Sequence, residues 1–191
     1  MIHVSWGNMK LGAIPNVSLP PVQTCRQHAP CAKKCYALKA WRMYPSARRA
    51  WRANLREYRN DPQSYFRQLT YALKARAPRF FRWHASGDIP DAEYLKGMIN
   101  LAKSCPQTRF LAFTKQYELV QGKRLPANLT VVLSAWPGLP LPSTTRPIAY
   151  MQDGTETRVP SNAIECPGNC ETCGQCWSLP QIHRDVVFHA H

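Results

Sequence analysis

Seven of the eight cysteines in this 191-residue chain lie in two short segments near its ends. The first segment has the spacing C-x5-C-x3-C, and the second has C-x3-C-x2-C-x2-C followed by a tryptophan. Thiolates this close repel one another unless a metal neutralises them, and such spacing allows one short segment to wrap a compact cubane. The N-terminal cysteine group is Cys25, Cys31 and Cys35, and the C-terminal cysteine group is Cys166, Cys170, Cys173 and Cys176.

Three kinds of chemistry compete for the C-terminal cysteine group: an iron–sulfur cluster, a structural zinc ion and disulfides. Disulfides need an oxidising compartment. Residues 1–6 lack the basic segment and apolar run of a secretory signal. Structural zinc sites usually join two C-x2-C-like pairs across a longer loop. Three consecutive short intervals with four thiols favour a 4Fe–4S cluster, with zinc and disulfides as the alternatives.

The N-terminal cysteine group also indicates a metal site, but it offers only three thiols. One position on a cluster would then be open, or filled by a small molecule, a histidine or a cysteine of the other group. The sequence leaves open whether the two groups form one cluster or two. The eighth cysteine, Cys105, shares a helical face with Tyr94, Leu95 and Met98, so we expect it to pack in the core.

The chain is strongly basic, with 25 Lys and Arg against 11 Asp and Glu and a formal net charge of +14. Two clusters bound by thiolates would lower that charge only to roughly +11. We therefore expect an acidic partner, either nucleic acid or a nucleotide-like small molecule carrying phosphate or carboxylate. No run approaches the roughly 18 apolar residues of a membrane span, so we expect a soluble, cytoplasmic protein without a membrane partner.

Apolar segments alternate with helical periodicity through most of the chain, which predicts an α/β fold with a parallel sheet covered by helices. We expect a single domain over 1–191, with metal-binding loops at about 22–36 and 164–178. Ser46 is the expected N-cap of the first long helix, and Asp61 that of the second. The expected strands are a short one within 1–21, then 79–86, 109–114, 129–135, 148–151 and 186–189, and the other helices are 62–76, 91–104 and 117–122.

Polar residues follow two successive predicted strands at the points where these strands end. In parallel sheets, ligands bind outside the carboxyl ends of the strands. We therefore expect these side chains to contact a substrate or cofactor, although Asp88 as a helix cap and His84 as a core residue are plain structural alternatives. The residues are His84, Ser86, Asp88, Thr114 and Lys115, with Ser134 and Trp136 on the same rim.

A basic stripe lies along the first long helix, on an arc separate from its apolar residues. Such a face is usually solvated, but it is also a candidate surface for nucleic acid or another anion. No helix-turn-helix pattern, aromatic RNA-binding signature or P-loop accompanies it. The arginine face consists of Arg48, Arg49, Arg52, Arg56 and Arg59.

Several motifs together resemble the gene product 88 family of phages, whose relatives are radical-S-adenosylmethionine-like proteins. These motifs are G-N-x-K-L-G at 7–12, the N-terminal cysteine group with Thr24 and Tyr36-Ala37, W-H-x-S-G-D at 83–88, F-x-x-F-T-K at 110–115, and the closing C-x2-C-x2-C-W. The resemblance implies a phage or prophage iron–sulfur protein with a partial or distorted TIM-barrel-like fold.

Two functions follow as hypotheses. The first is a radical-S-adenosylmethionine-like enzyme of unknown substrate, in which the N-terminal cysteine group holds a cluster with one open iron and S-adenosylmethionine is a possible cofactor. The second is a non-catalytic iron–sulfur protein whose basic surface binds nucleic acid or a host protein. They differ in whether any iron lacks a protein ligand and faces a polar pocket.

Overall fold

The protein is an α/β structure built on one seven-stranded sheet in which every neighbouring pair of strands is parallel. The computed structural model describes residues 1–189. The strand order is β1-β2-β3-β4-β5-β7-β6, so both ends of the chain contribute to the same sheet. The strands are β1 (Asn16–Val17), β2 (Phe80–Trp83), β3 (Arg109–Thr114), β4 (Leu129–Ser134), β5 (Ile148–Gln152), β6 (Ile164–Glu165) and β7 (Val186–His189).

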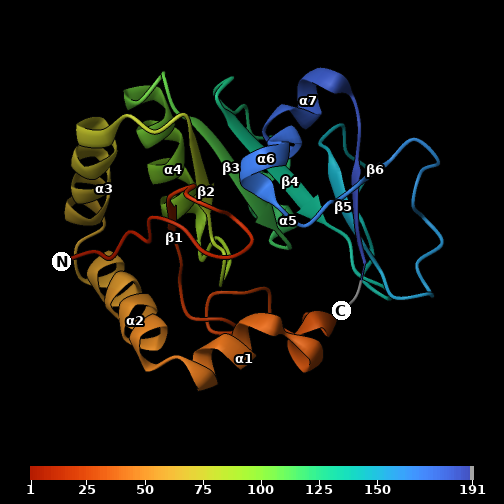
Figure 1. The fold of residues 1–191 in the computed structure, drawn as a ribbon, viewed down its shortest axis with the longest axis horizontal. Helices are drawn as coiled ribbons and strands as arrows, with labels where there is room; N and C mark the ends of the chain where they lie inside the picture. The colour runs from red at the N-terminus through yellow and green to blue at the C-terminus, as the bar shows by residue number, and fades with distance from the viewer. Residues whose placement is uncertain (190–191) are drawn as a thin grey trace.

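The longer helices gather on one side of the sheet, and the C-terminal segment lies on the other side (Figure 1). The predicted parallel α/β sheet is confirmed, while its closure into a barrel stays a prediction. The helices are η1 (Pro30–Lys34), α1 (Tyr36–Met43), α2 (Pro45–Asn60), α3 (Pro62–Arg76), α4 (Ala92–Ser104), α5 (Tyr117–Val120), α6 (Cys170–Cys173), η2 (Gln175–Ser178) and α7 (Leu179–Ile182).

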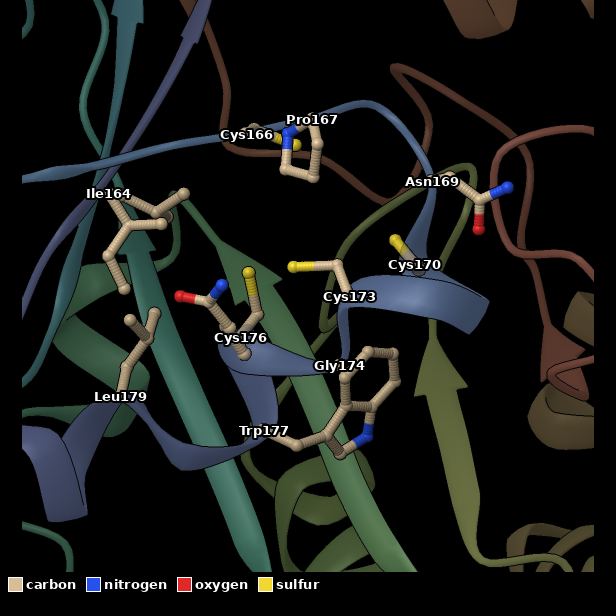
Figure 2. A pocket seen from close by; sticks show the side chains of 12 residues that line it. Ile164, Cys166, Pro167, Asn169, Cys170, Cys173, Gly174, Cys176, Trp177 and Leu179 are labelled. Atoms are coloured by element: carbon tan, nitrogen blue, oxygen red, sulfur yellow. The ribbon is translucent and has the colours of Figure 1, made fainter.

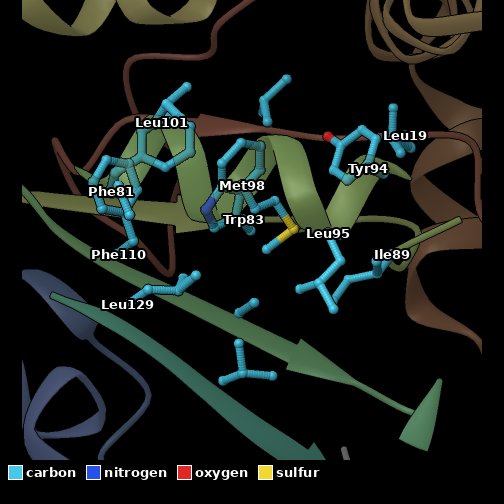
Figure 3. Packing of buried hydrophobic residues seen from close by; sticks show 14 of the residues in the cluster. Leu19, Phe81, Trp83, Ile89, Tyr94, Leu95, Met98, Leu101, Phe110 and Leu129 are labelled. Atoms are coloured by element: carbon cyan, nitrogen blue, oxygen red, sulfur yellow. The ribbon is translucent and has the colours of Figure 1, made fainter. Parts of the chain in front are cut away.

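Both faces of the central strands are buried, which explains why they read as continuous apolar runs. On β3, Phe110 and Ala112 pack beneath the long helices, while Leu111 packs beneath the C-terminal segment. The larger core lies between the sheet and α4, with Trp83 and Met98 at its centre (Figure 3). Cys105 is fully buried in this core, as predicted.

Capping explains where several helices begin. The Asp61 carboxylate accepts the backbone N–H of Ser64 at 2.8 Å, so the predicted cap of α3 is confirmed. The Asp91 carboxylate caps α4 in the same way. The prediction for Ser46 was wrong: Tyr44 is the N-cap of α2, and Ser46 lies inside the helix because Pro45 occupies its first turn.

The sequence reasoning missed α1 and the short elements around the second cysteine group. No helix was predicted at residues 36–43, but they form a helix whose only buried residue is Ala37. With eight residues, this helix is shorter than the window of about 11 to 18 residues over which helical periodicity is read. Across residues 1–189, no helix combines the length and the apolar character needed to cross a membrane.

Candidate metal-binding site

The C-terminal cysteine group lines one small pocket on the side of the sheet opposite α4 (Figure 2). Cys170 and Cys173 lie on α6, and Cys176 lies on η2. Cys166, from the loop after β6, closes another side of the same space. The Cys166 amide donates to the carbonyl of Val187 at 3.0 Å, so the sheet itself holds this loop. Four thiols from two adjoining segments therefore border one common space.

The tryptophan after the last cysteine anchors this segment to the sheet. Trp177 is 2% exposed, and its indole N–H donates to the carbonyl of Phe81 at 3.2 Å. Its own carbonyl accepts hydrogen bonds from Arg109 at 2.7 Å and from Thr130 at 3.1 Å. The Phe80 ring lies 4.9 Å from the Trp177 ring, measured between centroids. These contacts bind the cysteine-bearing turn to three adjacent strands.

The N-terminal G-N-x-K-L-G motif packs against the same segment. The Asn8 side chain accepts the amides of Lys10 and Leu11, which folds the motif into a tight turn. The carbonyl of Lys10 then accepts the amide of Cys170 at 2.9 Å. Gly12 has a φ of +61°, and a Cβ at this position would lie 1.9 Å from the Glu171 carboxylate. The motif therefore supports α6. This close approach explains why the motif ends in a glycine, because a side chain at position 12 would collide with Glu171.

Four thiols are the donor set of a 4Fe–4S cluster and also that of a structural zinc ion. Within residues 1–189, no three His, Cys, Asp or Glu side chains are arranged to hold one metal ion. Each thiolate of a cubane binds a different iron, so its ligands enclose a multi-atom body rather than a single point. A tetrahedral zinc site would bring all four thiolates to about 2.3 Å from one atom. All eight cysteines are free thiols, which leaves the disulfide alternative without support.

Burial sets the protonation state of these thiols. It raises the pKa of Cys176 to about 12, although the nearby positive charge of Arg82 opposes the shift. Burial also raises the pKa of Cys170, against the opposing charges of Arg82 and Lys10. Both thiols are therefore protonated near neutral pH when no metal is bound. Metal binding here must release protons, as it does at other thiolate sites.

The loop with the N-terminal cysteine group lies at the carboxyl ends of β2 and β3. The Leu19 amide donates to the carbonyl of Ser86 at 2.9 Å, and the Thr24 hydroxyl accepts the amide of Asp88 at 3.2 Å. Further along this loop, the Arg26 guanidinium donates to the carbonyl of Lys115 at 3.2 Å. The structure therefore places this loop beside the strand-end motifs, at the edge where parallel sheets bind ligands.

Charges around this loop act on its cysteines in opposite directions. Burial raises the pKa of Cys25 to about 12, and the negative charge of Asp88 adds to the shift. Burial also raises the pKa of Cys31, but the positive charge of Lys115 opposes it. An open groove lies beside Cys25. The groove is lined by Val22, Gln23, Thr24, Cys25, Arg26, Gln27, Pro90, Gln116 and Glu118.

Most of the predicted contact residues brace this rim. The buried Asp88 carboxylate accepts the amides of Ile89 at 2.7 Å and Lys115 at 2.8 Å, and so joins the ends of β2 and β3. The Ser86 hydroxyl donates to the carbonyl of Leu19, and the Thr114 hydroxyl accepts the amide of Gln116. Burial raises the pKa of Asp88, while the hydrogen bonds that it accepts oppose the shift.

His84 faces the core instead of the open rim. It is 3% exposed, and its Nε2 lies 3.2 Å from the Tyr94 hydroxyl under α4. Burial, together with the positive charge of Arg82, lowers the pKa of His84 to about 3. Its φ is +55°, in the left-handed region where the strand turns into the loop. The neutral imidazole belongs to a buried polar chain that continues from Tyr94 to Tyr65.

The arginine face of α2 points away from the core. Asn54, Leu55 and Tyr58 bury the opposite side of the helix, while Arg49, Arg52, Arg56 and Arg59 are exposed and Arg48 is half-buried. Within residues 1–189, none of these five arginines forms an ion pair with Asp or Glu. The Arg52 guanidinium lies 5.1 Å from the centroid of the Trp41 ring, which in turn stacks on Trp51. The face is therefore cationic, with aromatic rings at its edge.

Sequence reasoning overlooked two cations close to the cysteines, Lys10 and Arg82. Lys10 lies in the G-N-x-K-L-G motif and Arg82 in the predicted strand 79–86, but neither residue type signals a metal site by itself. Only the fold brings Lys10 next to α6 and turns Arg82 toward the C-terminal segment. An arginine within an otherwise apolar strand was the one available signal, because a charged residue there needs a specific anionic neighbour.

The gene product 88 family model matches residues 4–138, and the chain belongs to this family of phage proteins. The matched region includes the N-terminal cysteine group, the strand-end motifs and the arginine face. The C-terminal cysteine group lies beyond it. No curated protein and no solved structure matches the chain.

Proposed function

We propose that this protein binds a 4Fe–4S cluster through the C-terminal cysteine group. The observation that carries the proposal is one pocket bordered by Cys166, Cys170, Cys173 and Cys176, which is the four-thiol donor set of such a cluster. Lys10 and Arg82 supply positive charge beside it, which suits an assembly with net negative charge. When bound, the cluster would supply one-electron chemistry and would tie the C-terminal segment to the folded state.

The N-terminal cysteine group is the second proposed metal site. Its three thiols, Cys25, Cys31 and Cys35, would leave one iron of a 4Fe–4S cluster without a cysteine ligand. Its place at the carboxyl edge of a parallel sheet, beside an open groove, supports a site that small molecules can reach. This is the arrangement that a radical-S-adenosylmethionine-like enzyme would need, and Gln116, which lines the groove, and its neighbour Lys115 are the candidates to contact a bound cofactor.

The arginine face supports a second candidate function, the binding of nucleic acid or another acidic partner. Its guanidinium groups have no carboxylate partners within residues 1–189, so they are free to contact phosphates. The Trp41–Trp51 stack beside them adds the aromatic surface on which unpaired bases stack. In this alternative, the clusters organise loops without taking part in catalysis, and the protein acts in the host cytoplasm.

Anaerobic purification with iron and acid-labile sulfide analysis tests the cluster proposal. We expect brown protein with at least about four iron and four sulfide per chain. Cys173→Ser should lower both, and it should also lower solubility because metal binding and folding are coupled. Cys105→Ser is the matched control. Cys105 is buried in the core between the sheet and α4, on the opposite face from the pocket, so this substitution should leave the iron content unchanged. Colourless protein carrying stoichiometric zinc would contradict the proposal.

The enzyme hypothesis has a separate test. S-adenosylmethionine is added to the reduced protein, and the electron paramagnetic resonance spectrum is recorded in the wild type and in Cys31→Ser. If S-adenosylmethionine changes the spectrum of the wild type but not that of Cys31→Ser, the result supports an accessible iron at the N-terminal cysteine group. An unchanged spectrum favours the non-catalytic alternative.

A further inference from the structure

Arg82 is a cation on the sheet face that carries the C-terminal cysteine group. On β2, Phe81 and Trp83 point into the core beneath α4, so Phe80 and Arg82 point to the opposite face. Phe80 packs against Trp177 on that face. The Arg82 guanidinium lies 4.1 Å from the centroid of the Phe113 ring, and its Nε donates to the carbonyl of Trp83 at 3.0 Å. These contacts fix the guanidinium against an apolar floor.

This guanidinium lacks a carboxylate partner. Among residues 1–189, no Asp or Glu forms an ion pair with Arg82, although the side chain is half-buried. A cation withdrawn from water needs a nearby anion to offset the loss of hydration. The neighbours whose negative charge could interact with it are Tyr36, Cys166, Cys170 and Cys176. Metal-bound thiolates are the anions that this neighbourhood can offer.

The residues around the end of β2 pack beside the C-terminal cysteine group. The Ala85 side chain lies in the same apolar cluster as Cys170 and Cys176, and so does Phe113, the ring on which the Arg82 guanidinium lies. The carbonyl of Ala85 also accepts the hydroxyl of Tyr36, the residue after Cys35, at 2.6 Å. Arg82 is the cation that this segment carries.

We propose that Arg82 is the counter-charge of the C-terminal cysteine group and sets the reduction potential of the metal centre that this group would hold. The inference rests on the proposed function, because it concerns the residues around the thiolates that would hold the cluster. A fixed positive charge stabilises the reduced, more negative form of a nearby centre more than its oxidised form. Arg82 would therefore raise that reduction potential, and it acts as a positioning residue that does not bind metal.

Redox titration of the anaerobic holoprotein, followed by electron paramagnetic resonance, tests this role. Arg82→Met and Arg82→Gln remove the charge, and the Gln variant keeps a donor that can reach the carbonyl of Trp83. Both variants should shift the potential of the C-terminal centre to more negative values, and Arg82→Lys should restore most of the difference. Arg79→Met is the matched control, because it removes the same charge from a different position. Arg79 is exposed and lies against the Phe80 ring, close to the start of β2. This substitution should leave the potential unchanged.

The outcomes separate this inference from the function on which it rests. If wild-type protein binds no iron, the proposed function fails. If iron is bound but the potential of the C-terminal centre does not move in Arg82→Met and Arg82→Gln, the counter-charge role is wrong. An equal shift in Arg79→Met would show a general effect of net charge and would also overturn the inference.

Discussion

The backbone amide of Cys170 donates to the carbonyl of Lys10 at 2.9 Å. This hydrogen bond joins the N-terminal G-N-x-K-L-G turn to the first turn of α6, so the C-terminal cysteine group is held by a motif from the other end of the chain. The turn lies inside the region matched by the gene product 88 family, and the cysteines lie outside it. A turn within the matched region therefore helps to hold the C-terminal cysteine pocket, which lies outside that region.

Gly12→Ala tests that support. The new methyl group would lie 1.9 Å from the Glu171 carboxylate and 2.6 Å from its Cβ, at a φ of +61°. We expect a loss of about 2 to 4 kcal/mol in unfolding free energy, from left-handed strain and overpacking together. Iron per chain should fall as well, because α6 must move. Chemical denaturation and iron analysis measure the two effects.

Gly138→Ala is the matched control for this substitution. Gly138 also has a positive φ, +78°, but a Cβ there meets no atom within 4 Å. It should cost only about 1 kcal/mol and leave the iron content unchanged. Equal losses of stability and iron in the two variants would contradict the supporting role of the turn.

His84 should make the protein less stable in mild acid. Its pKa is about 3 in the folded protein against 6.5 for a free histidine, so the unfolded chain takes up the proton first as pH falls below 6.5. Stability from this group is complete above pH 6.5 and decreases toward pH 3. We expect a loss of about 1.4 kcal/mol between pH 7.5 and 5.5 from this one group. Urea denaturation at the two pH values measures it.

His84→Asn provides the comparison, because asparagine tolerates the left-handed φ of +55° and does not titrate. The variant should lose that part of the pH dependence. Tyr94→Phe removes the hydrogen-bond partner but keeps the buried imidazole, so the pH dependence should persist. The same pH dependence in wild type and His84→Asn would show that His84 is not its source.

Asp88→Ala should destabilise the rim of the sheet. The carboxylate accepts the amides of Ile89 and Lys115, and both would lose their acceptor in a buried place. We expect about 2 to 4 kcal/mol lower unfolding free energy, since each unsatisfied donor costs about 1 to 3 kcal/mol. Asp61→Ala is a comparison, because this exposed helix cap should cost only about 1 kcal/mol. A smaller loss for Asp88→Ala than for Asp61→Ala would refute the bracing role.

The arginine face should bind nucleic acid with strong dependence on salt. Neutralising Arg52 and Arg56 together should reduce the slope of log affinity against log salt by about 2, if both contact phosphates. Arg67→Gln with Arg76→Gln on α3 is a control of equal charge change, because these arginines lie outside the arginine face. Fluorescence anisotropy with single-stranded DNA and RNA gives the slopes. Salt-independent binding, or no binding at low salt, would contradict this function.

The alternation of apolar strands with helices was enough to predict the parallel sheet. The boundaries of β3 agree with the predicted 109–114, because the apolar run 110–113 faces both sides of the sheet and is followed by polar Thr114 and Lys115. The cap at Asp61 could be predicted because a cap is a local device. The helix α1 could not, because its eight residues are fewer than an analysis of periodicity needs.

The site was less predictable than the fold, since it depends on contacts between distant segments. Sequence spacing grouped the cysteines, but it could not reveal that Lys10 supports α6 or that Arg82 lies beside the C-terminal cysteine group. It also placed His84 among the candidate contacts, although a left-handed turn at the strand end directs the imidazole to Tyr94. Such local reversals have no reliable pattern in the sequence.

Anomalous diffraction from anaerobically grown crystals tests the central claim most directly. Data collected on both sides of the iron absorption edge locate iron without reference to activity. We predict a compact iron peak inside the pocket bordered by Cys166, Cys170, Cys173 and Cys176, with the four sulfurs around it. No iron in that pocket, or a single peak that appears at the zinc edge instead, would contradict the iron–sulfur account.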